Sequence, residues 1–260
     1  MEKDQVYHIL GRAYFSEEPH EKETLRRLAK MLRSATVFVD VGASLGQYVY
    51  HANKHLRGGY ILAIEPDPIR FDKLGENCRE WEFLSDNRIQ ALHAAVSDID
   101  GRTKFYTTNS SLSGGLFKHK STTSYPWREV IIDCFQLDTL LRDIQPDLVK
   151  IDVEGSELRV LRGCTRLLKE GKARFLVELH GWADPEGQKD PAAVFDLMRS
   201  FGYWSTNQGG RYLFAKRTKM EAMILLFGMQ VKGLLSCIAR WALPLWLRNR
   251  LWVLWQRHGY

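Results

Sequence analysis

The fold is decided by the stretch VFVDVGASLG, residues Val37–Gly46. A short β-branched run that ends at a glycine is typical of a buried, central parallel strand. The turn after this strand opens a helix that we predict to end near Leu56, before two successive glycines. Residues 60–65 and 69–81 then predict a second strand and a second helix. Together they form one β-α-β unit, which indicates an α/β fold.

The sequence on both sides of this unit extends the pattern. A helix is predicted at 21–33, because leucines recur there at helical spacing. The remaining predicted elements are strands at 89–96, 148–153, 175–179, 203–205 and 212–215, a helix at 156–169, and an added strand pair at 105–106 and 130–132. The Ser/Thr/Gly-rich loop 107–124 is long for a connection without structure of its own, so it is a candidate lid or acceptor loop.

The turn after the first strand is a candidate cofactor site. Gly42 and Gly46 allow a ligand to approach the backbone and the N-terminus of the following helix. The dinucleotide fingerprint has a glycine where this chain has Ser44, and the Asp40 carboxylate would repel a pyrophosphate. It would not repel a cofactor that carries an ammonium and a sulfonium. The turn therefore favours S-adenosylmethionine over NAD or ATP, with a tight turn that binds no ligand as the alternative.

Two acids further along the chain extend this prediction. Glu65 lies nineteen residues after Gly46 and ends the next strand, where a carboxylate can accept hydrogen bonds from both ribose hydroxyls. Asp98 follows the third predicted strand and either contacts the adenine edge or serves only as a turn residue. The predicted cofactor-binding residues are therefore Asp40, Gly42, Ser44, Gly46, Glu65 and Asp98.

The distribution of charge separates the chain into a neutral body and a basic tail. Residues 215–260 hold eight Lys and Arg against one acid, which leaves 29 basic and 30 acidic residues in the rest. The body therefore has no electrostatic support for nucleic-acid binding. The four cysteines form no C-x-x-C pair, and the charged N-terminus is not followed by an apolar run. These features predict neither a disulfide framework nor export, and we expect a cytoplasmic protein.

The tail also carries four of the eight tryptophans, interspersed with arginines. Apolar residues recur at helical spacing from about residue 222, but Lys232 and Arg240 interrupt the run before it reaches a transmembrane length. Trp and Arg on amphipathic segments are typical of helices that lie in a membrane interface. Residues 220–260 are therefore predicted to bind an anionic membrane surface, on the inner face of the membrane. The alternative is a helical hairpin that packs on the domain or on a second subunit.

The motifs resemble those of the FkbM-type methyltransferases from about Val37 to Leu179. The resemblance is carried by residues 37–46 (VFVDVGASLG), 63–66 (AIEP), 95–98 (AVSD), 137–140 (LDTL), 148–157 (LVKIDVEGSE) and 160–163 (VLRG). It implies a Rossmann-like class I methyltransferase fold, with a mostly parallel sheet and helices on both faces. It also implies S-adenosylmethionine as the methyl donor and O-methylation, often of sugars or natural products. Ser44 departs from the family pattern, which often has Asn there, and the tail lies outside the resemblance.

A cluster of acids and one histidine is the candidate catalytic site. Asp152 and Glu154 follow one predicted strand, and Glu178 and His180 close the next, so all four lie at the carboxyl edge of the sheet. A neutral His180 or a carboxylate could take the proton of an acceptor hydroxyl. Alternatively, Asp152, Glu178 and His180 could bind a divalent ion that lowers the pKa of that hydroxyl. Glu157 is interpreted as a first-turn acid that interacts with the helix dipole.

These features predict an N-terminal helical lead at 1–34, a methyltransferase domain at 35–217 and a basic, Trp-rich amphipathic C-terminal appendage at 218–260. The predicted activity is S-adenosylmethionine-dependent O-methylation of a small-molecule or glycan acceptor. A nicotinamide-dependent oxidoreductase and a catalytically inactive membrane-associated module are the two alternatives. Ser44 speaks against the first, and the complete set of Asp40, Gly42, Gly46 and Glu65 speaks against the second.

Overall fold

The computed structural model describes residues 19–108, 114–116, 127–180, 191–207 and 211–216. The chain divides into two compact units, Met1–Lys216 and Arg217–Tyr260, and all of the described residues belong to the first. The predicted tail therefore lies outside the described residues, as does most of the loop 107–124. None of the helices in the described ranges is long and apolar enough to span a bilayer.

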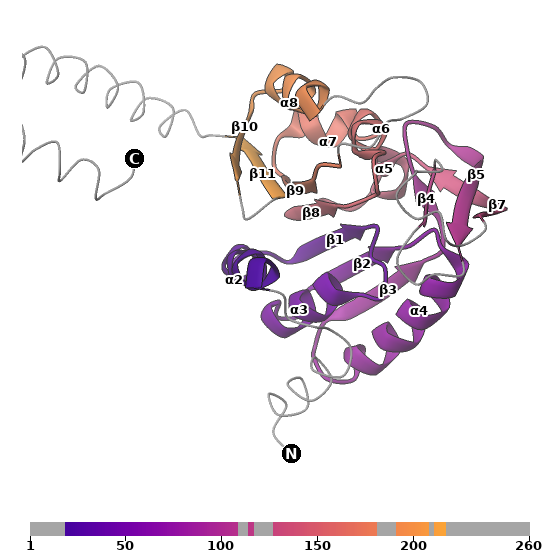
Figure 1. The fold of residues 1–260 in the computed structure, drawn as a ribbon. Coiled ribbons are helices and arrows are strands. Elements are labelled where there is room, and N and C mark those ends of the chain that lie inside the picture. Colours follow the sequence, from indigo (N-terminus) through magenta and orange to yellow (C-terminus); the bar gives the residue numbers. More distant parts are fainter. Residues whose placement is uncertain (1–18, 109–113, 117–126, 181–190, 208–210, 217–260) are drawn as a thin grey trace, which may run out of the picture. The chain divides into compact units, whose positions relative to one another are not determined.

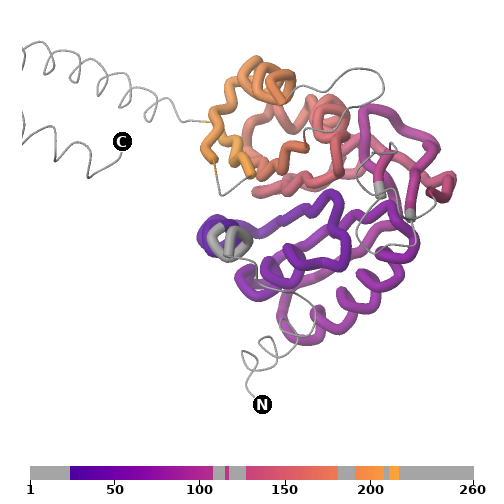
Figure 2. Tube along the Cα trace, viewed as in Figure 1, coloured from indigo at the N-terminus to yellow at the C-terminus, as the bar shows by residue number. Residues whose placement is uncertain are grey.

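A seven-stranded sheet in the order β10-β11-β9-β8-β1-β2-β3 forms the centre of the first unit (Figure 1). Its strands are β1 Val37–Val41, β2 Tyr60–Ile64, β3 Arg88–Leu92, β8 Leu148–Ile151, β9 Arg174–Glu178, β10 Tyr203–Asn207 and β11 Arg211–Lys216. Five of them are parallel, and β11 pairs antiparallel with both β9 and β10. Figure 2 shows β1 beside β8, where the two halves of the chain meet.

Helices cover both faces of this sheet (Figure 1). One face packs against α2 Pro19–Leu32, α3 Gln47–His55 and α4 Pro68–Glu82. The other packs against α5 Leu137–Leu140, α6 Glu157–Arg162, α7 Thr165–Glu170 and α8 Pro191–Ser200. The strands read as continuous apolar runs because both of their faces are buried: Phe38 belongs to the first core and Val39 to the second. The predicted Rossmann-like fold is confirmed.

The third predicted strand, 89–96, is wrong as a single element. It divides into β3 in the main sheet and β4 Ala95–Val96, which pairs with β7 Trp127–Phe135 in a second sheet. This four-stranded sheet has the order β4-β7-β5-β6, with β5 Gly101–Thr108 and β6 Gly114–Gly115. The predicted pair at 105–106 and 130–132 is confirmed as part of the longer antiparallel pairing of β5 with β7.

The predicted helix 156–169 is interrupted, and α6 and α7 take its place. A Cβ atom at Gly163 would lie 2.1 Å from the carbonyl oxygen of Ser97, so the segment after β4 packs directly against this glycine. Helical spacing of the apolar residues continues through this point, which explains why the sequence pattern predicted one helix. The interruption is imposed by the contact with Ser97, which lies far away in the sequence.

Candidate functional site

A cavity of about 360 Å³ opens at the carboxyl ends of β1, β2 and β8. The glycine turn, Glu65 and Arg70 line one part of it, and Lys150, Asp152 and Glu154 line another. Apolar side chains of the second sheet and its neighbours, among them Phe105 and Leu116, complete the wall. The cavity therefore combines an apolar wall with a small number of convergent polar groups, which is the usual character of a ligand site.

The glycine turn is shaped by contacts within the protein. Gly42 has a φ of +79°, and a Cβ atom there would lie 1.9 Å from the carbonyl oxygen of Asp152. Gly46 has a φ of +93° and packs against side chains of α4. Ser44, which occupies the position of a glycine in the dinucleotide fingerprint, also adopts a left-handed conformation, with φ 51°. The turn thus brings the end of β8 directly against the end of β1, and Gly42, Ser44 and Asp152 meet at the cavity.

Glu65 anchors this turn from the end of β2. Its Oε2 accepts a hydrogen bond from the Ser44 backbone N–H at 2.7 Å, and its Oε1 accepts one from the Asp67 N–H at 2.9 Å. An ionised carboxylate has about four acceptor sites, so further donors can still bind it. Burial raises the pKa of Glu65 to about 7, although the nearby Arg70 and the two backbone donors favour the charged form. The side chain is 2% exposed and lines the cavity.

Lys150 is the central cation of the site, although no sequence motif predicted a role for it. Its Nζ lies 3.1 Å from Asp40 Oδ1 and 3.3 Å from Asp152 Oδ2, and it donates to the Gly42 carbonyl at 3.0 Å. Asp40 is fully buried, and this burial raises its pKa to about 6 against the opposing effect of Lys150. Asp40 does not line the cavity, so in this structure it acts on the site through Lys150.

A second cation, Arg211 of β11, lies near Lys150. Its Nη2 lies 2.5 Å from Glu178 Oε2, and its guanidinium lies 5.3 Å from the centre of the Tyr48 ring. Lys150 Nζ lies 4.9 Å from the centre of the same ring. Arg211 lines the cavity, whereas Glu178 does not. Glu178 is thus the ion-pair partner of Arg211.

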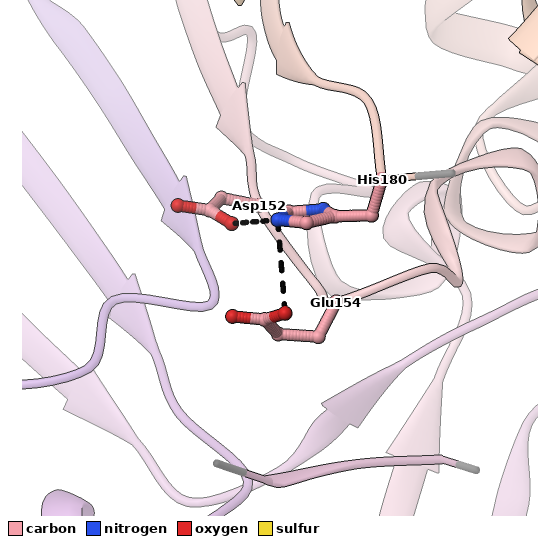
Figure 3. A group of neighbouring side chains, drawn as sticks. All are labelled: Asp152, Glu154 and His180. Atoms are coloured by element: carbon pink, nitrogen blue, oxygen red, sulfur yellow. Dashed lines mark ion pairs between the residues drawn. The ribbon is translucent and has the colours of Figure 1, made fainter. Parts of the chain in front are cut away.

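His180 joins Asp152 and Glu154 in a cluster (Figure 3). Its Nε2 lies 3.8 Å from Asp152 Oδ1 and 3.7 Å from Glu154 Oε2. Its Nδ1 lies 2.8 Å from Oε1 of the buried Glu157, and the same oxygen accepts a hydrogen bond from the Gly155 N–H. Glu157 is therefore the partner that orients the imidazole, beyond the helix-dipole role expected from sequence.

The acids around His180 determine its protonation. Burial disfavours the imidazolium, but the hydrogen bond to Glu157 and the negative charges of Glu154 and Asp152 outweigh burial and raise the pKa of His180 to about 9. The pKa of Asp152 is lowered, because Lys150, His180 and Arg211 together outweigh its burial. At neutral pH the histidine of this structure is therefore an imidazolium, and the neutral base considered from sequence is the minor form.

Asp98 lies apart from these groups. Its Oδ1 lies 3.6 Å from Arg159 Nη1 and accepts a hydrogen bond from the Ser97 hydroxyl. It does not line the cavity, and its role at the adenine edge stays a prediction.

Three site residues lack a role in the sequence-based prediction: Arg70, Lys150 and Arg211. Lys150 could have been found, because it lies two residues before Asp152 and therefore on the same side of the strand. Arg211 has no local signal, since it reaches the site only through the pairing of β11 with β9.

Comparison with known proteins adds a family match. The model of the methyltransferase FkbM domain family matches residues 40–204, which include every cavity element except Arg211. The hexuronic acid methyltransferase AglP of Haloferax volcanii is 29% identical over 166 residues, or 64% of this chain and 65% of AglP. The chain thus matches slightly less than two thirds of that relative. The methyltransferase sdnD of Sordaria araneosa is 26% identical over 212 residues, or 68% of this chain and 80% of sdnD.

Among solved structures, the methyltransferase FkbM of Methylobacillus flagellatus KT is similar, with 19% identity and a TM-score of 0.48. That match covers 69% of this chain and 43% of the other.

Proposed function

Because the chain belongs to the FkbM methyltransferase family, we propose that it transfers a methyl group from S-adenosylmethionine to a hydroxyl oxygen of a sugar, glycan or natural-product acceptor. Membership in the family supports methyl transfer and speaks against the nicotinamide-dependent alternative. Beyond family membership, we propose that the accepting atom is a hydroxyl oxygen and that the acceptor is a sugar, a glycan or a natural product.

One observation carries this proposal: a single cavity connects the glycine turn to the acidic cluster. Glu65 and Ser44 line the end that suits a nucleoside, and Asp152 and Glu154 line the end that suits an acceptor with several hydroxyls. A donor and an acceptor that bind in one cavity have their reacting atoms close together, and such placement lowers the barrier of a transfer reaction substantially.

The residues of the cavity fit S-adenosylmethionine. Glu65 retains acceptor capacity for ribose hydroxyls beyond its two backbone donors. Arg70 lines the cavity, and its Nε and Nη2 are buried without a hydrogen-bond partner among the described residues, so they can donate to a ligand. When bound, the cofactor supplies an electrophilic methyl carbon on a sulfonium.

The acidic end of the cavity can hold and activate the acceptor. Carboxylate oxygens of Asp152 and Glu154 can accept hydrogen bonds from two hydroxyls and thereby orient the attacking oxygen. The same carboxylates can receive the hydroxyl proton as the new bond to the methyl carbon forms. Lys150 and Glu157 hold Asp152 and His180 in place for this step.

The choice of acceptor is tested with labelled cofactor. We expect that the purified chain, incubated with ¹³C-methyl S-adenosylmethionine and oligosaccharides that contain uronic acids, forms a methyl ether on a sugar hydroxyl. Uronic acids are chosen because the relative AglP is a hexuronic acid methyltransferase. NMR identifies the labelled carbon, and treatment with alkali separates an ether, which survives, from an ester. A product that is only an ester, or a methylated nitrogen, would contradict hydroxyl transfer.

We also propose that residues 220–260 hold the enzyme on an anionic membrane surface, near a lipid-linked or membrane-proximal acceptor. The support is the basic, Trp-rich sequence of the tail. Each basic residue near such a surface contributes about 1 kcal/mol, so the full-length chain is expected to float with vesicles that contain anionic lipid, less so at high salt. A chain that ends at Lys219 should stay in the soluble fraction. If the two forms float to the same extent, or if neither floats, the tail does not hold the enzyme on the membrane.

A further inference from the structure

Three donor atoms from two strand ends converge beside the cavity: one carboxylate oxygen each of Asp152 and Glu154, and a ring nitrogen of His180 (Figure 3). All three lie within 4.8 Å of one another. The imidazole Nε2 lies 3.8 Å from the Asp152 oxygen and 3.7 Å from the Glu154 oxygen. No other group of this kind occurs among the described residues.

These separations match the size of a metal ion. Bonds from a divalent ion to carboxylate oxygen or imidazole nitrogen are about 2.0–2.2 Å, so two ligands of one ion lie at most roughly 4.4 Å apart. The distances of 3.8 Å and 3.7 Å from Nε2 to the two carboxylate oxygens fall below this limit. They are too long for hydrogen bonds. An ion between the three donors therefore requires only small side-chain movements.

The histidine is held in the orientation that a metal ligand needs. Glu157 Oε1 lies 2.8 Å from Nδ1, and it is itself held by the Gly155 N–H at 3.0 Å. Nδ1 donates its proton to Glu157, and Nε2 faces Asp152 and Glu154. An ion that binds there displaces the Nε2 proton of the imidazolium, as metal binding to histidine generally does. A carboxylate bound to the second nitrogen is the common arrangement around metal-binding histidines.

The charge of the surrounding network favours a cation. The ion pairs around the cluster contain five carboxylates (Asp40, Asp152, Glu154, Glu157 and Glu178) and three cations: Lys150, Arg211 and the His180 imidazolium. The carboxylates therefore outnumber the cations. Lys150 and Arg211 each lie against Tyr48 and their own acids, whereas the ion-pair partner of Glu154 is His180. The negative charge that remains is therefore concentrated at the three convergent donors.

We propose that Asp152, Glu154 and His180 bind one divalent transition-metal ion, with Mn²⁺ as a suitable occupant. The two carboxylates suit an ion such as Mn²⁺, and the imidazole favours a transition metal over Mg²⁺ or Ca²⁺. Asp152 and Glu154 line the cavity, so the remaining coordination positions face the acceptor and can hold its oxygens. This last role rests on the proposed function. Glu154 replaces Glu178 in the ligand set considered from sequence, because Glu178 pairs with Arg211.

The proposal is tested by binding, which needs no acceptor. The full-length chain is treated with EDTA, dialysed and titrated with MnCl₂, and free Mn²⁺ is measured by its EPR signal. We expect one saturable site per chain. Glu154→Gln and His180→Ala should each weaken binding tenfold or more. Glu157→Gln should weaken it by about 10–100-fold through loss of the histidine's orientation. Asp196→Asn, an equivalent change at an exposed acid on α8, should leave binding unchanged.

The outcomes separate this site from the proposed function. Absence of saturable Mn²⁺ binding at millimolar concentration, or binding that Glu154→Gln and His180→Ala leave intact in folded protein, overturns the metal site. Circular dichroism confirms that each variant is folded. Full methyl transfer by EDTA-treated protein without Mn²⁺ overturns the role of the ion in holding the acceptor, and the proposed function then stands. Mn²⁺ binding without transfer to any sugar acceptor supports the site and rejects sugars and glycans as acceptors.

Discussion

Replacing Lys150 with methionine is expected to lower the free energy of unfolding by about 3–5 kcal/mol, the cost of leaving a buried ion pair with one partner missing. Lys150 is 3% exposed, and its ammonium lies between the carboxylates of Asp40 and Asp152. Asp40 is fully buried, so no water can replace the lost cation there. Urea denaturation followed by circular dichroism measures the difference.

Two further variants make this result specific. Lys104→Met removes an equally short ion pair, with Glu129, but both side chains are largely exposed, so the loss should be only about 0–1 kcal/mol. Adding Asp40→Asn to Lys150→Met removes one orphaned charge, so the double variant should be more stable than the sum of the single changes predicts. If Lys150→Met lowers the free energy of unfolding no more than Lys104→Met does, the buried ion pairs contribute little to stability.

Replacing Glu65 with glutamine is expected to weaken S-adenosylmethionine binding by about 1.5–3 kcal/mol, the scale of hydrogen bonds to a charged group. Glu65 is the buried acid that both positions the Ser44 backbone and faces the cavity. Glutamine keeps the size of the side chain but replaces one acceptor oxygen by a donor. Isothermal titration calorimetry measures the affinity, and NAD serves as the ligand that should not bind.

The pH dependence of binding provides an independent check on Glu65. Burial raises its pKa to about 7, and ribose hydroxyls favour the ionised form. The affinity for S-adenosylmethionine should therefore reach its maximum above this pKa and should fall as the pH decreases through 7. Glu65→Gln should remove this dependence, whereas Glu76→Gln on the exposed side of α4 should retain both affinity and pH profile. If Glu65→Gln binds as tightly as the unmodified chain, Glu65 is not at the ribose.

The local sequence patterns determined the class of the main sheet, which is mostly parallel with helices on both faces. Continuous β-branched runs, such as residues 37–41, can only be buried on both faces, and the alternation with amphipathic helices requires parallel strands between two helical layers. The same logic placed Glu65, Asp152 and Glu154 at one edge, because the carboxyl ends of parallel strands coincide. These conclusions need only periodicity and chain order.

The sequence patterns were insufficient where a contact between distant segments decides the local structure. The break between α6 and α7 follows from the packing of Ser97 against Gly163, and the division of 89–96 follows from the pairing of β4 with β7. Along each of these two segments the preference of the residues for helix or for strand does not change. A long-range contact therefore determines where each element ends.

The partners of the charged residues were decided by the tertiary structure in the same way. The sequence by itself identified a methyltransferase of this family and the edge of the sheet that carries its acids. It could not distinguish Glu154 from Glu178 as the neighbour of Asp152 and His180, because both acids lie at strand ends on the same edge. The antiparallel pairing of β11 with β9 brings Arg211 to Glu178, and the left-handed backbone of Glu154 leaves that acid beside His180. Electrostatic pairing depends on distances of a few ångströms between side chains from different strands, and only the folded chain sets those distances.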